Sequence, residues 1–155
     1  MSDGTEKEAR TRAAKDALPP PVILLVEDNP ADVHMIREAL AVSRLAHELH
    51  VVADGERALD FVARKGEHAQ APVTDLVLLD LNIPKIHGHD VIARLRAQRD
   101  IGRLPIVVMT GSRLEKDIDR SFALHADGHI IKPTRLYEYV GELAFALNLV
   151  RRKAA

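Results

Sequence analysis

Three carboxylates of this chain follow apolar runs of the kind that form buried strands. Glu27 and Asp28 come directly after the run 22–26, and Asp80 follows the run 77–79. Where strands run parallel inside a sheet, their carboxyl ends meet at the edge where ligands bind. Carboxylates meeting there would repel one another by about 4 kcal/mol per pair, for a separation of roughly 4 Å and an effective dielectric constant of about 20. A cation must offset that repulsion, and Mg²⁺ is predicted because it prefers oxygen ligands.

Two further polar residues follow apolar runs and complete a set that could transfer a phosphoryl group. Thr110 comes after the run 106–109 and offers a hydroxyl donor, and Lys132 comes after 128–131 and supplies a fixed positive charge. Asp80 is the candidate oxygen nucleophile, because carboxylates can form acyl phosphates. Nucleophile, metal, ammonium and hydroxyl together make a phosphoryl-transfer site that works by positioning and charge neutralisation.

The elements that must position these residues alternate regularly along the chain. The predicted strands are 22–26, 48–53, 75–79, 106–109 and 128–131. A helical pattern of apolar residues follows each of them, and the polar segment 65–74 is expected to be a surface loop. The crossovers are long enough for parallel pairing, so the expected fold is an α/β doubly wound sheet of five parallel strands with five helices.

Length and composition predict a single domain. With 155 residues, 46% of them hydrophobic, the chain can bury about two thirds of its unfolded surface in one core. Residues 1–21, which end in three prolines, are expected to form a flexible N-terminal arm. Residues 22–150 would form the domain and 151–155 a basic C-terminal tail.

The bulk properties disfavour several classes of partner and site. A net charge of −1 and an aromatic content of 3% favour neither nucleic acid nor an anionic membrane. No apolar run approaches the roughly 18 residues of a membrane span, so no membrane association and a cytoplasmic location are expected. The absence of cysteine excludes thiolate metal sites and cysteine nucleophiles. The eight histidines are dispersed and are expected to have surface or structural roles.

Four motifs resemble the receiver domain of two-component response regulators. They are Val26-Glu27-Asp28-Asn29, Leu79-Asp80-Leu81-Asn82-Ile83-Pro84 with Gly88, Met109-Thr110-Gly111, and Ile131-Lys132-Pro133. All four occur in order at these spacings, and the resemblance covers about residues 22–150. It implies a single domain with the flavodoxin-like strand order 2-1-3-4-5.

The resemblance also implies a role for each polar residue at the sheet edge. Asp80 would take a phosphoryl group from the phosphohistidine of a histidine kinase, and Thr110 and Lys132 would bind the phosphoryl oxygens. The Mg²⁺ ligands would be Glu27, Asp28, Asp80 and the backbone carbonyl of Asn82.

Other residues are expected to tune the site or its output. His129 stands three residues before the lysine, where receivers usually carry an aromatic side chain that couples to the residue at Thr110. An imidazole in that place makes pH-sensitive output a hypothesis. Asn82 and Ser112 are predicted to flank the phosphoryl group and to tune its hydrolysis. The resemblance further implies a cis peptide bond between Lys132 and Pro133.

Partners are predicted from the resemblance and from the last helix. The segments 64–72 and 78–85 resemble the stand-alone regulators of phytochrome-type histidine kinases. No effector module follows residue 150, so output is expected to be a protein contact made by the receiver itself. A homodimer through the strand 128–131 and the last helix is predicted, with Phe145 and Leu149 opposite the apolar core stripe. Incidental surface exposure of these two residues is the alternative.

Two other functions remain open at this point. One is an aspartyl-nucleophile phosphatase of the haloacid dehalogenase type, but that class wants a second aspartate two residues after the nucleophile, where this chain has Asn82. The other is a pseudo-receiver that acts as a scaffold without phosphorylation. The complete set of acidic, hydroxyl and ammonium residues disfavours it.

Overall fold

Five parallel strands form one sheet in the computed structural model, which describes residues 3–16, 19–101 and 103–154. The strands are β1 (Val22–Val26), β2 (Glu48–Val52), β3 (Leu76–Leu79), β4 (Ile106–Thr110) and β5 (Gly128–Ile131). Their order in the sheet is β2-β1-β3-β4-β5, and every neighbouring pair is parallel. The predicted α/β fold with strand order 2-1-3-4-5 is therefore confirmed.

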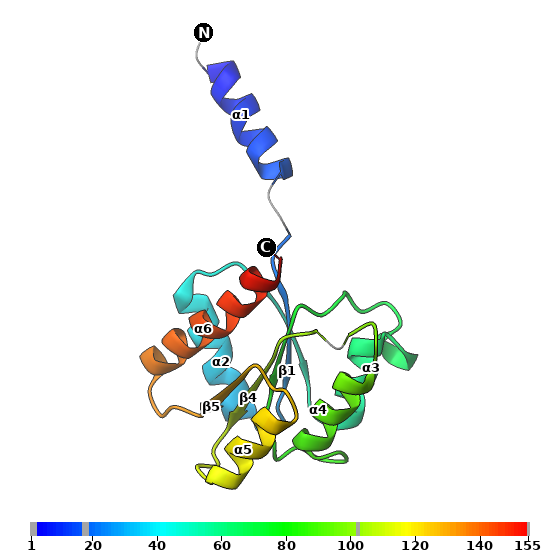
Figure 1. Cartoon of the computed structure of the whole chain (residues 1–155). Coiled ribbons are helices and arrows are strands. Elements are labelled where there is room, and N and C mark those ends of the chain that lie inside the picture. Colours follow the sequence, from blue (N-terminus) through cyan, green and yellow to red (C-terminus); the bar gives the residue numbers. More distant parts are fainter. Residues whose placement is uncertain (1–2, 17–18, 102, 155) are drawn as a thin grey trace.

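Helices cover both faces of the sheet (Figure 1). They are α1 (Asp3–Asp16), α2 (Pro30–Ser43), α3 (Gly55–Ala63), the 3-10 turn η1 (Gly66–His68), α4 (Gly88–Ala97), α5 (Glu115–Ala123) and α6 (Leu136–Ala154). Helices α2 and α6 pack together on one face, and α3 and α4 lie on the other. None of the helices in the described ranges has the length and hydropathy that crossing a bilayer requires.

The described α-helices number six rather than five because part of the N-terminal segment is helical. Helix α1 stands away from the sheet in Figure 1 and holds no large apolar residue. Alanine, glutamate, lysine and arginine favour a helix here, but there is no apolar face to bury. The predicted arm and tail also include residues 1–2, 17–18 and 155, which lie outside the described residues.

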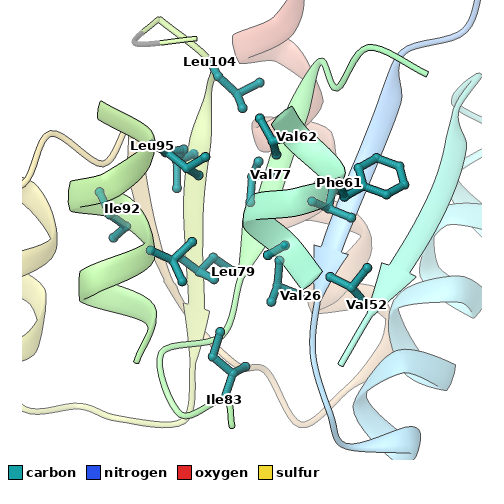
Figure 2. Packing of buried hydrophobic residues seen from close by; sticks show 14 of the residues in the cluster. Val26, Val52, Phe61, Val62, Val77, Leu79, Ile83, Ile92, Leu95 and Leu104 are labelled. Carbon is teal, nitrogen blue, oxygen red and sulfur yellow. The ribbon is translucent and has the colours of Figure 1, made fainter. Parts of the chain in front are cut away.

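Two apolar layers hold the sheet between its helices. The central strands β1, β3 and β4 are buried along their whole length, as expected for parallel strands covered on both faces. Alternate residues of β1 enter opposite layers, with Leu24 and Val26 facing α3 and α4 and Ile23 and Leu25 facing α2 and α6. Figure 2 shows the first of these layers.

Strand register aligns the ends of β1 and β3 at the same edge. Val26 pairs with Leu79 of β3 and with Val52 of β2. The ladder continues one residue further, since the Glu27 N–H donates to the Val52 carbonyl at 3.0 Å and the Asp80 N–H to the Val26 carbonyl at 3.0 Å. Hydrogen bonds of the sheet thus fix the backbone beneath both carboxylates.

The backbone after Asp80 lies against the start of α4 at Gly88. The Gly88 N–H donates to the Leu81 carbonyl at 2.9 Å. A Cβ atom at position 88 would lie 2.6 Å from the Leu81 Cα and 2.9 Å from the Asp80 carbonyl oxygen. Only glycine permits this approach, which explains why a glycine follows the Asp80 motif.

Candidate functional site

The three carboxylates predicted to share a metal lie together at the carboxyl edge of the sheet. One oxygen from each of Glu27, Asp28 and Asp80 lies within 4.8 Å of the others. Glu27 and Asp80 are buried, whereas Asp28 is exposed. Carboxylates at this spacing, with an open side toward solvent, suit a hard divalent cation that keeps some of its water ligands.

Lys132 brings its ammonium to the same point from the residue after β5. Its Nζ lies 2.7 Å from the Glu27 Oε2, 3.0 Å from the Asp80 Oδ2 and 2.8 Å from the Asp32 Oδ2. Asp32 sits in the first turn of α2 and was not among the residues predicted from the sequence. One ammonium therefore contacts three carboxylates, and Asp28 adds a fourth to the group, which leaves negative charge for a metal to offset.

The pKa values of these groups follow from burial and from the ion pairs. Burial raises the pKa of Glu27, against the hydrogen bond from Lys132, which lowers it. Burial alone would lower the pKa of Lys132, but hydrogen bonds to Asp32, Glu27 and Asp80 outweigh it and raise that pKa. Lys132 consequently carries its positive charge throughout the physiological pH range.

Asp80 is oriented through both of its oxygens. The Asn82 N–H donates to the Asp80 Oδ1 at 3.2 Å, and the Lys132 ammonium donates to Oδ2 at 3.0 Å. Asn82 itself is exposed beside the acidic group. The carboxylate is thus held by one neutral donor and one charged donor, which fix its orientation.

The structure places Thr110 at the end of β4 and Ser112 just beyond it. Thr110 is fully buried, and its Oγ1 accepts a hydrogen bond from the Ser112 N–H at 3.2 Å. The Lys132 N–H donates to the Thr110 carbonyl at 2.8 Å, which links the two strand ends. The Ser112 hydroxyl donates to the Asp117 Oδ2 at 2.6 Å, in the first turn of α5. Any contact of Ser112 with a phosphoryl group stays a prediction.

Two histidines have a buried ring nitrogen on the β4, α4 and α5 side of the molecule. The Nε2 of His129 is buried and has no hydrogen-bond partner among the described residues. His89 is also buried, and its Nε2 lies 3.1 Å from the Ser121 Oγ and 3.3 Å from the Asp117 carbonyl oxygen. Burial is the main cause that lowers the pKa of both histidines. Both imidazoles are therefore neutral in the native protein near pH 7.

Native stability is expected to decrease as the pH falls below about 6.5, the ordinary histidine value. Because the pKa of His89 and of His129 is lowered by folding, the unfolded chain binds protons there that the native protein does not. Each histidine can contribute a slope of about 1.4 kcal/mol per pH unit within that window, with stability lost toward acid pH. Urea unfolding at a series of pH values measures this slope.

The control for the pH dependence is the exposed His34. Replacing His89 and His129 together by glutamine should flatten the slope below pH 6.5, while His34→Gln should leave it as in the wild type. An unchanged slope in the double variant would assign the acid sensitivity to other groups.

One prediction made from the sequence is wrong in part, and another is wrong. Leu149 was expected opposite the core stripe, but it is half-buried and packs against the apolar layer beneath α6. It follows the buried Ala146 by three residues, so the two lie on the same flank of the helix. Phe145 is exposed, as predicted. The Lys132–Pro133 bond is trans rather than cis, which is the intrinsically favoured isomer even before proline.

Asp32 and His89 are the residues at or near the site that sequence reasoning missed. Asp32 follows Asp28 by four residues, and a helix starts between the two, at Pro30. A carboxylate in the first turn of a helix that starts at the acidic edge is a signal that could have been used. No local pattern distinguishes the buried His89 from the exposed histidines.

Comparison with known proteins agrees with this geometry. The model of the family "Response regulator receiver domain" matches residues 23–143. Response regulator Rcp1 from a Synechocystis species is 42% identical over 118 residues, which cover 76% of this chain and 80% of Rcp1. The crystal structure of the Mn²⁺-bound form of Rcp1 superposes with a TM-score of 0.77 at 38% identity, covering 81% of this chain and 94% of that one.

Two further solved structures are similar. The phosphorylated cyanobacterial phytochrome response regulator RcpA has a TM-score of 0.77 at 40% identity, covering 83% of this chain and 94% of that one. The bacteriophytochrome response regulator AtBRR has a TM-score of 0.72 at 31% identity, covering 86% of this chain and 95% of that one. With the sheet order and the acidic edge described above, these matches show that the chain belongs to the response regulator receiver domain family.

Proposed function

We propose that this protein is a response regulator that accepts a phosphoryl group on Asp80 from a histidine kinase. The observation that carries the proposal is the meeting of the Lys132 ammonium with the carboxylates of Glu27, Asp28 and Asp80. Such a group can hold a divalent metal and a phosphoryl group together. The haloacid dehalogenase alternative is not favoured, because the family match covers residues 23–143 and Asn82 replaces the required second aspartate.

The metal is proposed to be Mg²⁺, held by Glu27, Asp28, Asp80 and the backbone carbonyl of Asn82. The side chains in this set offer only oxygen, the donor that hard cations prefer. The structure of Rcp1 described as Mn²⁺-bound supports a divalent ion of this kind. When bound, the metal would neutralise charge on the transferred phosphoryl group.

The residues of the chain would act on the phosphoryl group in one displacement. An oxygen of Asp80 forms a bond to phosphorus while the N–P bond of the phosphohistidine breaks, and its electron pair stays on the imidazole nitrogen. Lys132 neutralises the phosphoryl oxygens, and the Thr110 hydroxyl donates to them from the neighbouring strand end. Hydrolysis of the acyl phosphate by water would return Asp80 to its first state.

The energy that these bonds could supply is comparable with the energy that signalling requires. Hydrogen bonds with a charged partner contribute about 1.5–3 kcal/mol each, so bonds from Thr110 and Lys132 would contribute about 3–6 kcal/mol together. Inverting a two-state equilibrium from 1:99 to 99:1 takes about 5.5 kcal/mol. The upper part of this range could switch a surface of the receiver without further contacts, provided that these bonds form only in the phosphorylated state.

Labelling with a small phosphodonor tests the function. In acetyl phosphate and Mg²⁺, the intact mass of the chain should increase by one phosphoryl group, and a chelator such as EDTA should prevent the increase. Labelling that persists in EDTA would contradict a metal-dependent site. Transfer from candidate histidine kinases then identifies the physiological donor.

The proposed donor is a phytochrome-type histidine kinase. The proposed compartment is the cytoplasm, where the ATP used by such kinases is found. RcpA and AtBRR are described as phytochrome and bacteriophytochrome response regulators, which supports this partner. We expect phosphotransfer from such a kinase to outpace transfer from unrelated histidine kinases.

Output is proposed to pass through a homodimer that uses β5 and α6. Phe145 is 48% exposed on α6, and its ring lies 3.4 Å from the position of a Cβ on Gly128 of β5, so it spans both elements. Phe145→Glu should convert a dimer to a monomer in sedimentation velocity, because the carboxylate would be buried in the contact. The control is Val73→Glu, at an equally apolar exposed residue before β3. A dimer that persists in Phe145→Glu would place the interface elsewhere.

A further inference from the structure

We propose that Asp32 is a positioning residue of the phosphoryl-transfer site, which shares the Lys132 ammonium and thereby slows phosphoryl uptake by Asp80. The inference rests on the proposed function of Asp80. Its starting point is the ion pair between the Asp32 Oδ2 and the Lys132 Nζ at 2.8 Å, which joins residues one hundred positions apart.

The first turn of α2 fixes Asp32 in place. The Asn29 side chain caps this helix, and its Oδ1 accepts hydrogen bonds from the Ala31 N–H at 2.9 Å and the Asp32 N–H at 3.3 Å. A carboxylate is also favoured in the first turn by the helix dipole. The Asp32 side chain is therefore directed at Lys132 by a rigid helix start rather than by a loop.

The Lys132 ammonium has no donor left for a phosphoryl oxygen in this arrangement. It has three N–H donors and three carboxylate partners within 3.0 Å, namely Glu27, Asp32 and Asp80. A phosphoryl oxygen that binds Lys132 must compete with one of them. Asp32 is the most exposed of the three, with 28% of its side chain accessible against 1% for Glu27 and 8% for Asp80. It can exchange the ammonium for water most readily.

The charge of Asp32 also acts on the incoming donor. Because the Asp32 and Asp80 oxygens contact the same nitrogen at 2.8 and 3.0 Å, they lie no more than about 6 Å apart. A dianionic donor reacting at Asp80 is repelled over that distance. Coulomb's law in a water-like dielectric then gives about a tenfold lower rate than with an uncharged residue at 32. The same negative charge attracts the metal ion. Asp32 is therefore expected to slow the reaction of the donor and to strengthen binding of the metal.

The experiment compares Asp32→Asn with Asp32→Glu, which keeps the charge, in acetyl phosphate at saturating Mg²⁺. We expect Asp32→Asn to be labelled about tenfold faster and Asp32→Glu to behave as the wild type. The Mg²⁺ concentration for half-maximal labelling should rise in Asp32→Asn only. With phosphoramidate, a donor of lower negative charge, the gain in rate should be smaller. A purely structural effect of the substitution would not depend on the charge of the donor.

NMR of the Lys132 ammonium gives a readout independent of labelling. Its Nζ protons should be protected from solvent exchange in the wild type and in Asp32→Glu, and should lose that protection in Asp32→Asn. If the wild type is labelled but Asp32→Asn is labelled at the same or a lower rate, the role of Asp32 is contradicted. Unchanged protection of the Lys132 protons in Asp32→Asn contradicts it as well. Neither result contradicts the function of Asp80. A wild type that takes no label contradicts the proposed function itself.

Discussion

A chain with asparagine at position 80 is expected to take no phosphoryl group from acetyl phosphate or from a histidine kinase. The amide has no nucleophilic oxygen, yet it has the shape of the carboxylate and can still accept the Asn82 N–H bond that Asp80 Oδ1 accepts at 3.2 Å. Loss of label would therefore report on chemistry and not on unfolding. Intact-mass measurement after incubation in Mg²⁺ gives the result.

Stability and site mapping provide the controls for Asp80→Asn. The charge of Asp80 is one of the causes that raise the pKa of Glu27, so removing it relieves repulsion and should not reduce the stability of the fold. Asp90→Asn, at an exposed carboxylate in the first turn of α4, should be labelled as the wild type. If Asp80→Asn is labelled to the same extent, the acceptor is another residue.

Replacing Lys132 by methionine is expected to slow phosphoryl transfer about 100-fold or more while it strengthens binding of the metal. The ammonium is the one positive group bonded to Asp80 among the described residues, at 3.0 Å, and removing a charged stabiliser of a developing anion costs about that factor. Without it, the carboxylates face the metal with no competing cation. A divalent ion should then bind more tightly, by roughly tenfold.

Slower phosphoryl transfer together with tighter metal binding distinguishes this prediction from a general loss of structure, which would weaken both. Phosphorylation is followed by intact mass. Metal affinity is followed by titration calorimetry with Mg²⁺ at alkaline pH, because loss of the Lys132 bond raises the pKa of Glu27 further. Lys85→Met is the matched control, because Lys85 forms ion pairs with Asp54 and Glu56 at 3.6 and 3.8 Å, outside the acidic group. Weaker metal binding in Lys132→Met would show that the lysine holds the carboxylates in place rather than competing with the metal.

Much of the site could be predicted because it depends on strand ends. The apolar runs before Glu27 and Asp80 locate the ends of β1 and β3, and parallel pairing then places both residues at one edge. Lys132 follows from the same rule applied to β5. These inferences need only an apolar run, a polar residue directly after it and the parallel topology of the sheet.

The remaining features depend on angles and side-chain directions that no local pattern encodes. Asp32 reaches Lys132 because the Asn29 cap sets the direction in which α2 leaves the edge. His89 is a residue of α4 and is buried where this helix contacts Ser121 of α5. The two residues are about thirty positions apart in the sequence. Leu149 lies on the margin of the apolar stripe of α6, where spacing alone does not decide between core and surface.

The contact at Gly88 has a mechanical consequence. The loop after Asp80 and the start of α4 touch backbone to backbone, joined by the bond from the Gly88 N–H to the Leu81 carbonyl. No side chain stands between them to flex or change rotamer. A displacement of the loop on modification of Asp80 would thus be transmitted directly to the first turn of α4. The helix would then be expected to move as a rigid body.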